Sequence, residues 1–216
     1  MNYSSPIVPL VANAINLDAL IKAAQLSLSV QCPWLDYVFG RAITGQQLDE
    51  STKRAQTFPM VHGPDNEYMN LGPNSHYGSH AFFQVTGAET PVDYSAFMPN
   101  TYRVELALVC LYNVDLVAER WGRPADEVNG ETLKQALREA LAQIGIDTVL
   151  RIDESPTEVF RGYSYNHLQH QTFMHPEGGI KIAFVAHYLE TKLACAVGTD
   201  EPPETLNING RMYQLV

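Results

Sequence analysis

The run Tyr102–Asn113 constrains the fold more than any other part of this sequence. Every second residue from Tyr102 to Tyr112 is apolar or aromatic, and this period of two is that of a β-strand. The opposite face, from Arg103 to Leu111, is half apolar as well. Because even its second face is partly apolar, we expect this strand to be central in a sheet.

Two helices are predicted from apolar residues at helical spacing. The stronger begins near Asn129 and ends at Gly145, and its apolar stripe is typical of a helix that covers a sheet. The other covers Asn16–Val30, with Asn16 as its expected N-cap. The stripe of the stronger helix consists of Leu133, Ala136, Leu137, Ala140, Leu141 and Ile144.

Shorter segments complete the predicted order of elements. Thr148–Asp153 and Ile180–Leu189 alternate as strands, and Pro156–Tyr163 between them suits one or two helical turns that start at a proline. Gly45–Asn100 is rich in turn-forming residues, which predicts a loop-rich excursion with one or two strands. Its β-like runs are Thr57–Val61, Glu67–Leu71 and His80–Thr86, and a further strand is expected in the tail at Leu206–Val216.

This order predicts an α+β fold: a small, mainly antiparallel β-sheet covered by helices on one face, with long loops and extended terminal arms. A chain of 216 residues is expected to form a single domain over 1–216. Its core is predicted at about 16–190, with an N-terminal arm at 1–15, the loop-rich excursion at 45–100 and a C-terminal arm at 198–216. The arms and the excursion lack apolar periodicity, so we expect neighbouring subunits to order them.

The charge balance excludes several classes of function. The chain has 24 Asp and Glu against 14 Lys and Arg, a formal net charge of −10. A basic stripe for nucleic-acid binding and attraction to an anionic membrane are therefore not expected. The N-terminus has no basic residue before Lys22, which is atypical of a secretory signal. The long uncharged stretches Ala23–Leu35 and Tyr68–Ala88 are too short or too polar to span a bilayer.

Histidines form two groups that leave a metal-dependent enzyme open as an alternative. His76 and His80 have the spacing of a zinc pair on a helix, but Gly78 and the residues before His76 disfavour a helix there. We interpret these histidines as loop residues with ordinary hydrogen bonds or subunit contacts, so no metal is expected. The groups are His62, His76 and His80, and His167, His170 and His175.

Motifs for other chemistry are missing from the sequence. No serine lies in a G-x-S-x-G elbow, and the glycine-rich stretches lack the lysine of a phosphate-binding loop. The thiols of Cys110 and Cys195 lie in apolar, strand-like contexts that raise a thiol pKa. Three distant cysteines, with Cys32 the third, indicate buried reduced thiols rather than a disulfide scaffold. We expect no enzyme activity and no cofactor.

Aromatic residues set among small polar residues predict contact surfaces instead. Such residues bury much area at a low cost in conformational entropy, which suits interfaces between proteins. Arg151 and Arg161 are expected to form ion pairs with the acids of a neighbouring subunit. The candidate interface residues are Tyr68, Tyr77, Phe82, Phe83, Arg151, Arg161, Tyr163 and Tyr165.

The element order over Asn16–Leu189 resembles that of the neck and tail structural proteins of tailed bacteriophages, in particular tail-terminator (tail-completion) proteins and the ring proteins near the portal. The segments that carry the resemblance are Trp34–Arg41, Glu67–Ser75, His80–Phe83, Phe160–Tyr163 and His175–Phe184.

The resemblance implies a non-enzymatic virion protein that is assembled in the host cytoplasm. Such proteins form homo-oligomeric rings, hexameric or twelve-fold, and contact neighbouring neck, portal or tail-tube proteins. The alternative, also a structural protein, is another capsid or fibre-base adaptor protein.

A ring around a genome channel should have a neutral or acidic wall, because lysines and arginines there would hold DNA phosphates. DNA is therefore expected to pass without specific binding. Candidate wall carboxylates are Asp153, Glu154 and Glu158, which lie in or beside turns next to strands. Exposed acids that serve only solubility are the alternative explanation.

Overall fold

A computed structural model of the chain describes residues 5–48, 50, 53–62, 68–72, 78–93, 99–146, 148–164, 175–191, 205–208 and 211–214, the last two ranges by their backbone only. The helices are α1 (Asn16–Gln31), α2 (Val114–Trp121), α3 (Gly130–Gln143) and α4 (Pro156–Val159). The strands are β1 (Tyr37–Arg41), β2 (Ile43–Leu48), β3 (Ala55–His62), β4 (Tyr68–Asn70), β5 (Ser79–Val85), β6 (Thr90–Asp93), β7 (Thr101–Asn113), β8 (Val149–Asp153), β9 (Glu177–Leu189), β10 (Thr205–Ile208) and β11 (Arg211–Gln214).

The main sheet has the strand order β1-β5-β7-β9-β8, and β6 pairs with β7 beside it. Among the described strands of this sheet, β1 and β5 run parallel and the other pairs are antiparallel. β7 lies in the middle and pairs with β9 along its whole length, from Thr101 opposite Leu189 to Asn113 opposite Glu177. The central position predicted for this strand is confirmed, as is the mainly antiparallel sheet.

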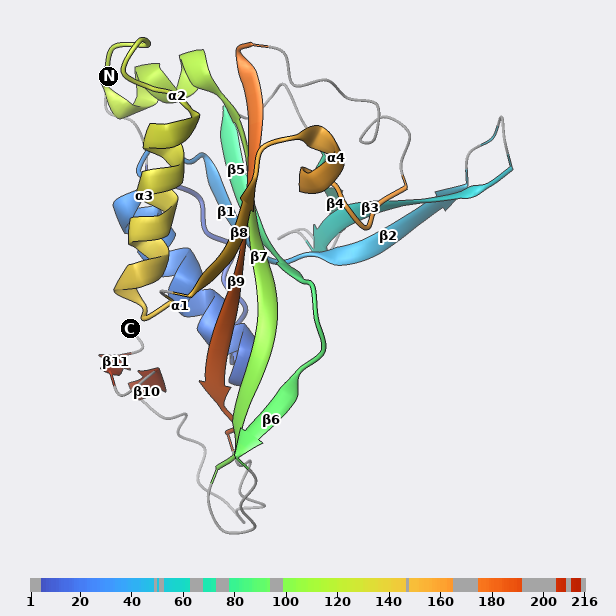
Figure 1. Ribbon diagram of the computed structural model, residues 1–216, viewed down its shortest axis with the longest axis vertical. Helices are drawn as coiled ribbons and strands as arrows, with labels where there is room; N and C mark the ends of the chain where they lie inside the picture. The colour runs from blue at the N-terminus through green and yellow to red at the C-terminus, as the bar shows by residue number, and fades with distance from the viewer. Residues whose placement is uncertain are drawn as a thin grey trace.

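One face of the sheet is covered by α1 and α3 (Figure 1). The predicted apolar face of β7 meets the α3 stripe there, and Leu137 and Leu141 have no exposed surface. Inward residues of β9, from Ile180 to Tyr188, join the same cluster. Burial of these apolar side chains is the main force that holds the helices on the sheet. The predicted α+β fold with helices on one face is confirmed.

The N-cap predicted for α3 is confirmed, and the N-cap predicted for α1 is not. The Asn129 side chain accepts hydrogen bonds from the backbone N–H groups of Glu131 and Thr132, and the Thr132 hydroxyl accepts one from the backbone N–H of Asn129. This capping box marks the start of α3. Asn16 was expected to cap α1 and does not. Ile15 occupies that position, while Asn16 Oδ1 accepts a hydrogen bond from the backbone N–H of Thr191.

The opposite face carries a second and smaller core. α4 and the small sheet β2-β3-β4 pack there, on the side away from α1 and α3 (Figure 1). The members of this core are Phe39, Val61, Leu71, Phe82, Val109, Leu111, Val159, Phe160 and Tyr163. The predicted helical turn at Pro156 is α4, with proline in its first turn.

Several expectations need correction. The excursion at 45–100 holds β3, β4, β5, β6 and most of β2, rather than one or two strands. Within the N-terminal arm, the Ile7 N–H donates to Asp36 O and Ile7 O accepts from Val38, so this segment lies along β1 of its own chain. The tail forms a β10–β11 hairpin in place of one strand. α2 was not predicted at all, because its eight residues bury only Val117 and Ala118.

Candidate functional site

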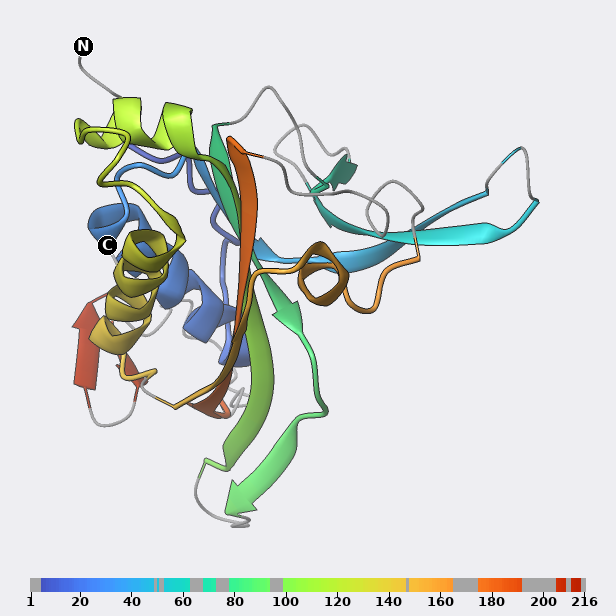
Figure 2. The ribbon, with the colours of Figure 1, turned by 45° about the horizontal axis from the view of Figure 1, so that its top comes forward.

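Two strands of the small sheet, β2 and β3, project from the body of the protein. A single residue, Ala42, separates β1 from β2, so one extended segment leaves the main sheet and enters the arm. β2 pairs with β3 from Ile43 opposite Met60 to Leu48 opposite Ala55. Figure 2 shows this two-stranded ribbon reaching well beyond the body. We refer to β2 and β3 together as the arm.

The base of the arm is held rigidly against the body. Val61, near the end of β3, is buried in the smaller core with Phe160 and Tyr163 of the α4 segment. Hydrogen bonds add to this packing: the backbone N–H of Thr57 donates to Ser164 Oγ at 3.0 Å. The direction in which the arm points is therefore set by the core and by α4.

Gly45 explains how large side chains of β3 pack against β2 in the arm. Gly45 lies directly opposite Phe58. A Cβ atom at Gly45 would stand 2.5 Å from Met60 Sδ and 2.9 Å from the Phe58 ring. The absence of a side chain lets Phe58 and Met60 lie flat across β2, so that Gly45 is buried in an otherwise exposed strand.

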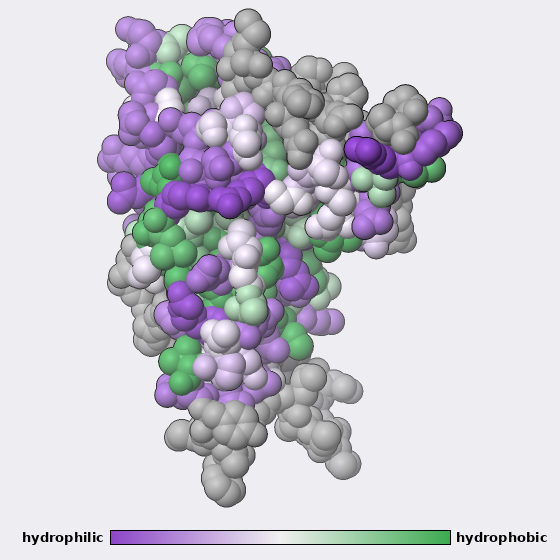
Figure 3. Space-filling view, turned by 45° about the vertical axis from the view of Figure 1, so that its right-hand side comes forward, coloured by the Kyte–Doolittle hydropathy of each residue, from purple (hydrophilic) through white to green (hydrophobic). Residues whose placement is uncertain are grey.

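The outer part of the arm has little contact with the body. Gln46, Gln47 and Leu48 are all exposed, and Leu48 keeps 58% of its surface accessible. Figure 3 shows hydrophilic and hydrophobic surface side by side at this end of the protein. A two-stranded ribbon is marginally stable on its own in water. An arm with this composition is suited to contact with another protein.

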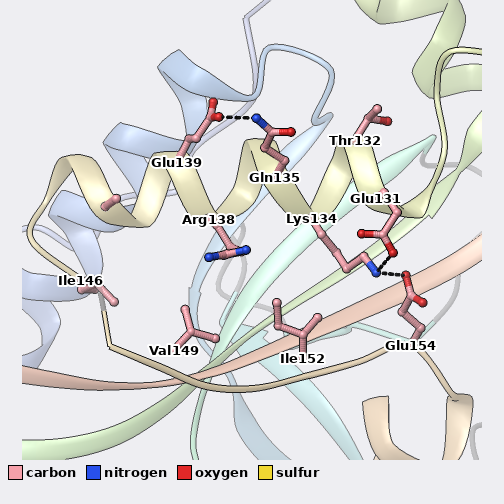
Figure 4. Close-up of a pocket in the computed structure, with 11 residues that line it drawn as sticks. Glu131, Thr132, Lys134, Gln135, Arg138, Glu139, Ile146, Val149, Ile152 and Glu154 are labelled. Atoms are coloured by element: carbon pink, nitrogen blue, oxygen red, sulfur yellow. Dashed lines mark hydrogen bonds and ion pairs between the residues drawn. The ribbon is translucent and has the colours of Figure 1, made fainter.

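A groove lies on the other side of the molecule, between α3 and β8 (Figure 4). It has a volume of about 760 Å³. Its floor is apolar, formed by Ile146, Val149 and Ile152. β8 is the last strand of the main sheet, and a β-bulge between Val149 and Arg151 interrupts its pairing with β9. This arrangement leaves apolar surface open beside an edge strand.

Charged side chains line the rim of this groove. Lys134 reaches between Glu131 and Glu154, and its Nζ lies 3.1 Å from Glu154 Oε1 (Figure 4). The hydrogen bond to Glu131 is the main cause that raises the pKa of Lys134. Arg138 and Glu139 extend the rim along α3. The rim therefore carries three acids and two bases around an apolar floor.

The predicted wall carboxylates all have cationic partners within the chain. Asp153 Oδ2 lies 2.7 Å from Arg151 Nε, and Glu158 Oε2 lies 3.2 Å from Arg151 Nη2. Glu158 also meets Arg161 Nη1 at 3.3 Å, and Glu154 meets Lys134. These carboxylates form a surface of mixed charge rather than an acidic one. Arg151 and Arg161 pair with acids of their own chain, and the ion pairs expected with a neighbouring subunit stay a prediction.

Burial corrects three of the aromatic interface candidates. Phe82 and Phe83 have no exposed surface, and Tyr163 keeps only 4%. Phe82 and Phe83 were misassigned because β5 is covered on both faces, by the two cores, and Tyr163 because it packs into the smaller core. Tyr68 is 60% exposed and is available for contact. Tyr77 and Tyr165 lie outside the described residues.

The described histidines do not gather into a metal-binding group. His80 is buried on β5, where Nε2 lies 3.2 Å from Leu71 O, and burial lowers its pKa to about 4. His62 and His175 are exposed, while His76, His167 and His170 lie outside the described residues. Over the described part of the chain, no group of three or more His, Cys, Asp or Glu side chains could hold a metal ion.

Two cysteines are buried in the core between the sheet and the helices. Burial raises the pKa of Cys32 to about 12 and that of Cys110 well above its ordinary value. This confirms the apolar context predicted for Cys110. Cys195 lies outside the described residues.

Sequence reasoning missed β2 of the arm and one buried charge. Ile43–Leu48 has no clear alternation and contains Gly45 and three polar residues, so no strand was expected there. Lys181, on β9, keeps only 4% of its surface exposed. In the alternation of Ile180–Leu189, Lys181 falls on the face opposite to the inward one. This position was the signal that could have placed Lys181 on the second face of the sheet.

Comparison with known proteins gives no relative: no protein-family model matches the chain, and no curated protein matches it either. Among the described helices, none has the length and apolar character needed to cross a membrane.

Proposed function

We propose that this chain is a non-enzymatic structural protein of a tailed-phage virion. It forms a homo-oligomeric ring, as a tail-terminator or head–tail connector subunit, around the genome channel. The observation that carries this proposal is the arm, which projects beyond the body and exposes Leu48 and Ile43. The element order discussed above, with its resemblance to neck and tail proteins, supports the same assignment.

A closed ring needs two different surfaces on each subunit, one that reaches out and one that receives. The arm is the first. The groove between α3 and β8 is suited to be the second, because its apolar floor can cover Leu48 of a neighbouring copy. Between β2 and β3 the sequence carries two acids and two bases, Asp49, Glu50, Lys53 and Arg54, so the basis of this pairing is apolar contact at Leu48 rather than net charge.

The overall charge suits a channel through which DNA moves. A formal charge of −10 per subunit is multiplied in a ring, and it disfavours tight binding to phosphates. The paired carboxylates Asp153, Glu154 and Glu158 add a surface of balanced charge. DNA is expected to pass such a wall without specific binding.

The mass of the purified full-length chain in solution tests the proposal, together with negative-stain images. Rings are expected for the unmodified chain and are expected to be lost on Leu48→Asp. Leu116→Asp is the matched control, because Leu116 is also an exposed leucine, at 44%, but lies on α2. A chain that stays monomeric at high concentration would contradict the proposal, as would tight duplex binding at physiological salt.

Cysteine cross-linking tests which surfaces meet. Leu48→Cys on one copy and Arg138→Cys on another place a thiol on the arm and one on the groove rim. A disulfide-linked dimer is expected only when the two variants are mixed. Efficient cross-linking of Leu48→Cys with itself would instead indicate a two-fold contact between arms, which does not close a ring.

A further inference from the structure

A second pocket lies on the face of the sheet that carries α4. Its volume is about 530 Å³, and residues of β5, β7, β8 and β9 line it together with Arg161 and Gly162, which follow α4. Lys181 and Arg151 line this pocket from two neighbouring strands, and Asp153 pairs with Lys181 in the backbone register. The pocket is separate from the arm and from the groove between α3 and β8.

Lys181 is unusual for a lysine because it is almost fully buried, with 4% of its surface exposed. Among the described residues, no hydrogen bond or ion pair reaches its ammonium group. Burial, followed by the nearby Arg151, lowers the pKa of Lys181, while Asp153 and Glu158 oppose this effect and Arg161 adds to it. The stem of Lys181 is buried, while its ammonium group keeps contact with solvent, so an anion that enters the pocket can reach it.

The acids nearby are already engaged with other cations. Asp153 and Glu158 pair with Arg151, and Glu158 pairs with Arg161 as well. Glu105, which also lines the pocket, lies 3.2 Å from Arg103 Nη2. Each carboxylate therefore has an arginine partner, and Lys181 is left as a positive charge in excess.

Gln84 adds an acceptor atom that has no partner among the described residues. Its Oε1 is shut off from solvent and accepts no hydrogen bond among the described residues. Gly162 faces it with a φ of 99° and no side chain, and a Cβ there would stand 3.6 Å from Gln84 Nε2. The pocket thus offers both a cationic donor and an unsatisfied acceptor, with space between them.

We propose that this pocket binds a phosphate group, either the free ion or a small phosphomonoester, with Lys181 at its base and Arg151 and Arg161 beside it. Phosphate matches both features, because its anionic oxygens accept hydrogen bonds from ammonium and guanidinium groups. A protonated phosphate oxygen can in turn donate to Gln84 Oε1. The volume leaves room for an organic substituent on the phosphate. This inference does not depend on ring formation.

Inorganic phosphate is the first probe, and its binding to the full-length chain is measured by calorimetry against chloride at equal ionic strength. Specific binding is expected for the unmodified chain, and Lys181→Gln should weaken it by about tenfold or more, the usual loss for a hydrogen bond to a charged group. Lys134→Gln is the matched control, since Lys134 lines the other groove. Arg161→Gln should have a smaller effect, because this arginine is largely exposed.

Lysine NMR gives a readout that does not depend on affinity. Phosphate should shift the Lys181 Nζ and Cε signals and raise the pKa of this group, because the bound anion stabilises its charged form. A sugar phosphate should compete for the same site. Equal weakening by Lys134→Gln and Lys181→Gln, or no shift at Lys181, would overturn the proposal and indicate non-specific anion binding.

Discussion

Thr57 on the arm and Ser164 after α4 hold each other by reciprocal hydrogen bonds, although 107 residues separate them. The Thr57 N–H donates to Ser164 Oγ at 3.0 Å, and the Ser164 N–H donates to Thr57 Oγ1 at 2.8 Å. This pair joins the arm to the segment that follows α4. The direction of the arm therefore depends on a contact that neither segment can make alone.

Loss of this pair should loosen the arm without unfolding the body. Thr57→Val and Ser164→Ala each remove one hydroxyl, at about 1 kcal/mol or less because the site is exposed. Hydrogen exchange is expected to speed up in β2 and β3 and to stay unchanged in β7 and β9. If the double variant costs as much as the sum of the two single variants, the two residues act independently and this account is wrong.

The stripe of α3 should dominate the stability of the body. Leu137→Ala or Leu141→Ala leaves a cavity in a fully buried region and should cost about 2–5 kcal/mol. Arg138→Ala, on the exposed side of the same helix, should change the free energy of unfolding by about 0.5 kcal/mol or less. Urea unfolding measures both. A small effect of both leucine variants would mean that α3 does not pack as described.

His80 should make the protein less stable in mild acid. Its Nε2 must carry a hydrogen to donate to Leu71 O, and burial lowers its pKa from 6.5 to about 4. The unfolded chain therefore binds a proton that the folded chain does not, so stability is lost as the pH falls from about 6.5 towards about 4.

His80→Gln keeps a hydrogen-bond donor but does not titrate. The difference between the two proteins in unfolding free energy, followed against pH by urea unfolding, should change by about 3 kcal/mol across this window. A difference that stays constant with pH would show that His80 is not neutral in the folded state.

Cys32 and Cys110 should resist alkylation until the protein unfolds. Both thiols are buried, and their raised pKa values leave almost no thiolate at neutral pH. Iodoacetamide labelling followed by peptide mass spectrometry should find these cysteines modified only in denaturant. Fast modification of Cys110 in the native protein would indicate that β7 opens on its own.

The elements with strong periodicity could be predicted from sequence, and those shaped by tertiary contacts could not. β7 and α3 were identified because their apolar residues repeat at the period of their own structure. β2 was missed because its strand is specified by pairing with β3, where Gly45 makes room for Phe58.

Site residues were harder to predict than elements. Phe82 and Phe83 were read as surface residues because a polar sequence surrounds them, yet both faces of β5 are covered. Arg151 and Arg161 form ion pairs with Glu158 of their own chain, and the expected ion pairs with a neighbouring subunit stay a prediction. Local sequence does not show which distant residue faces a charge.

The single residue between β1 and β2 has a consequence for how such proteins could vary. Beyond Gly45, pairs of residues could be added to or removed from the arm without disturbing either core. Each strand residue adds about 3.4 Å and reverses the face of the ribbon, so changes that keep the same face outward come in steps of about 7 Å. The distance to a neighbouring molecule could then be adjusted in fixed increments, while the body stays the same.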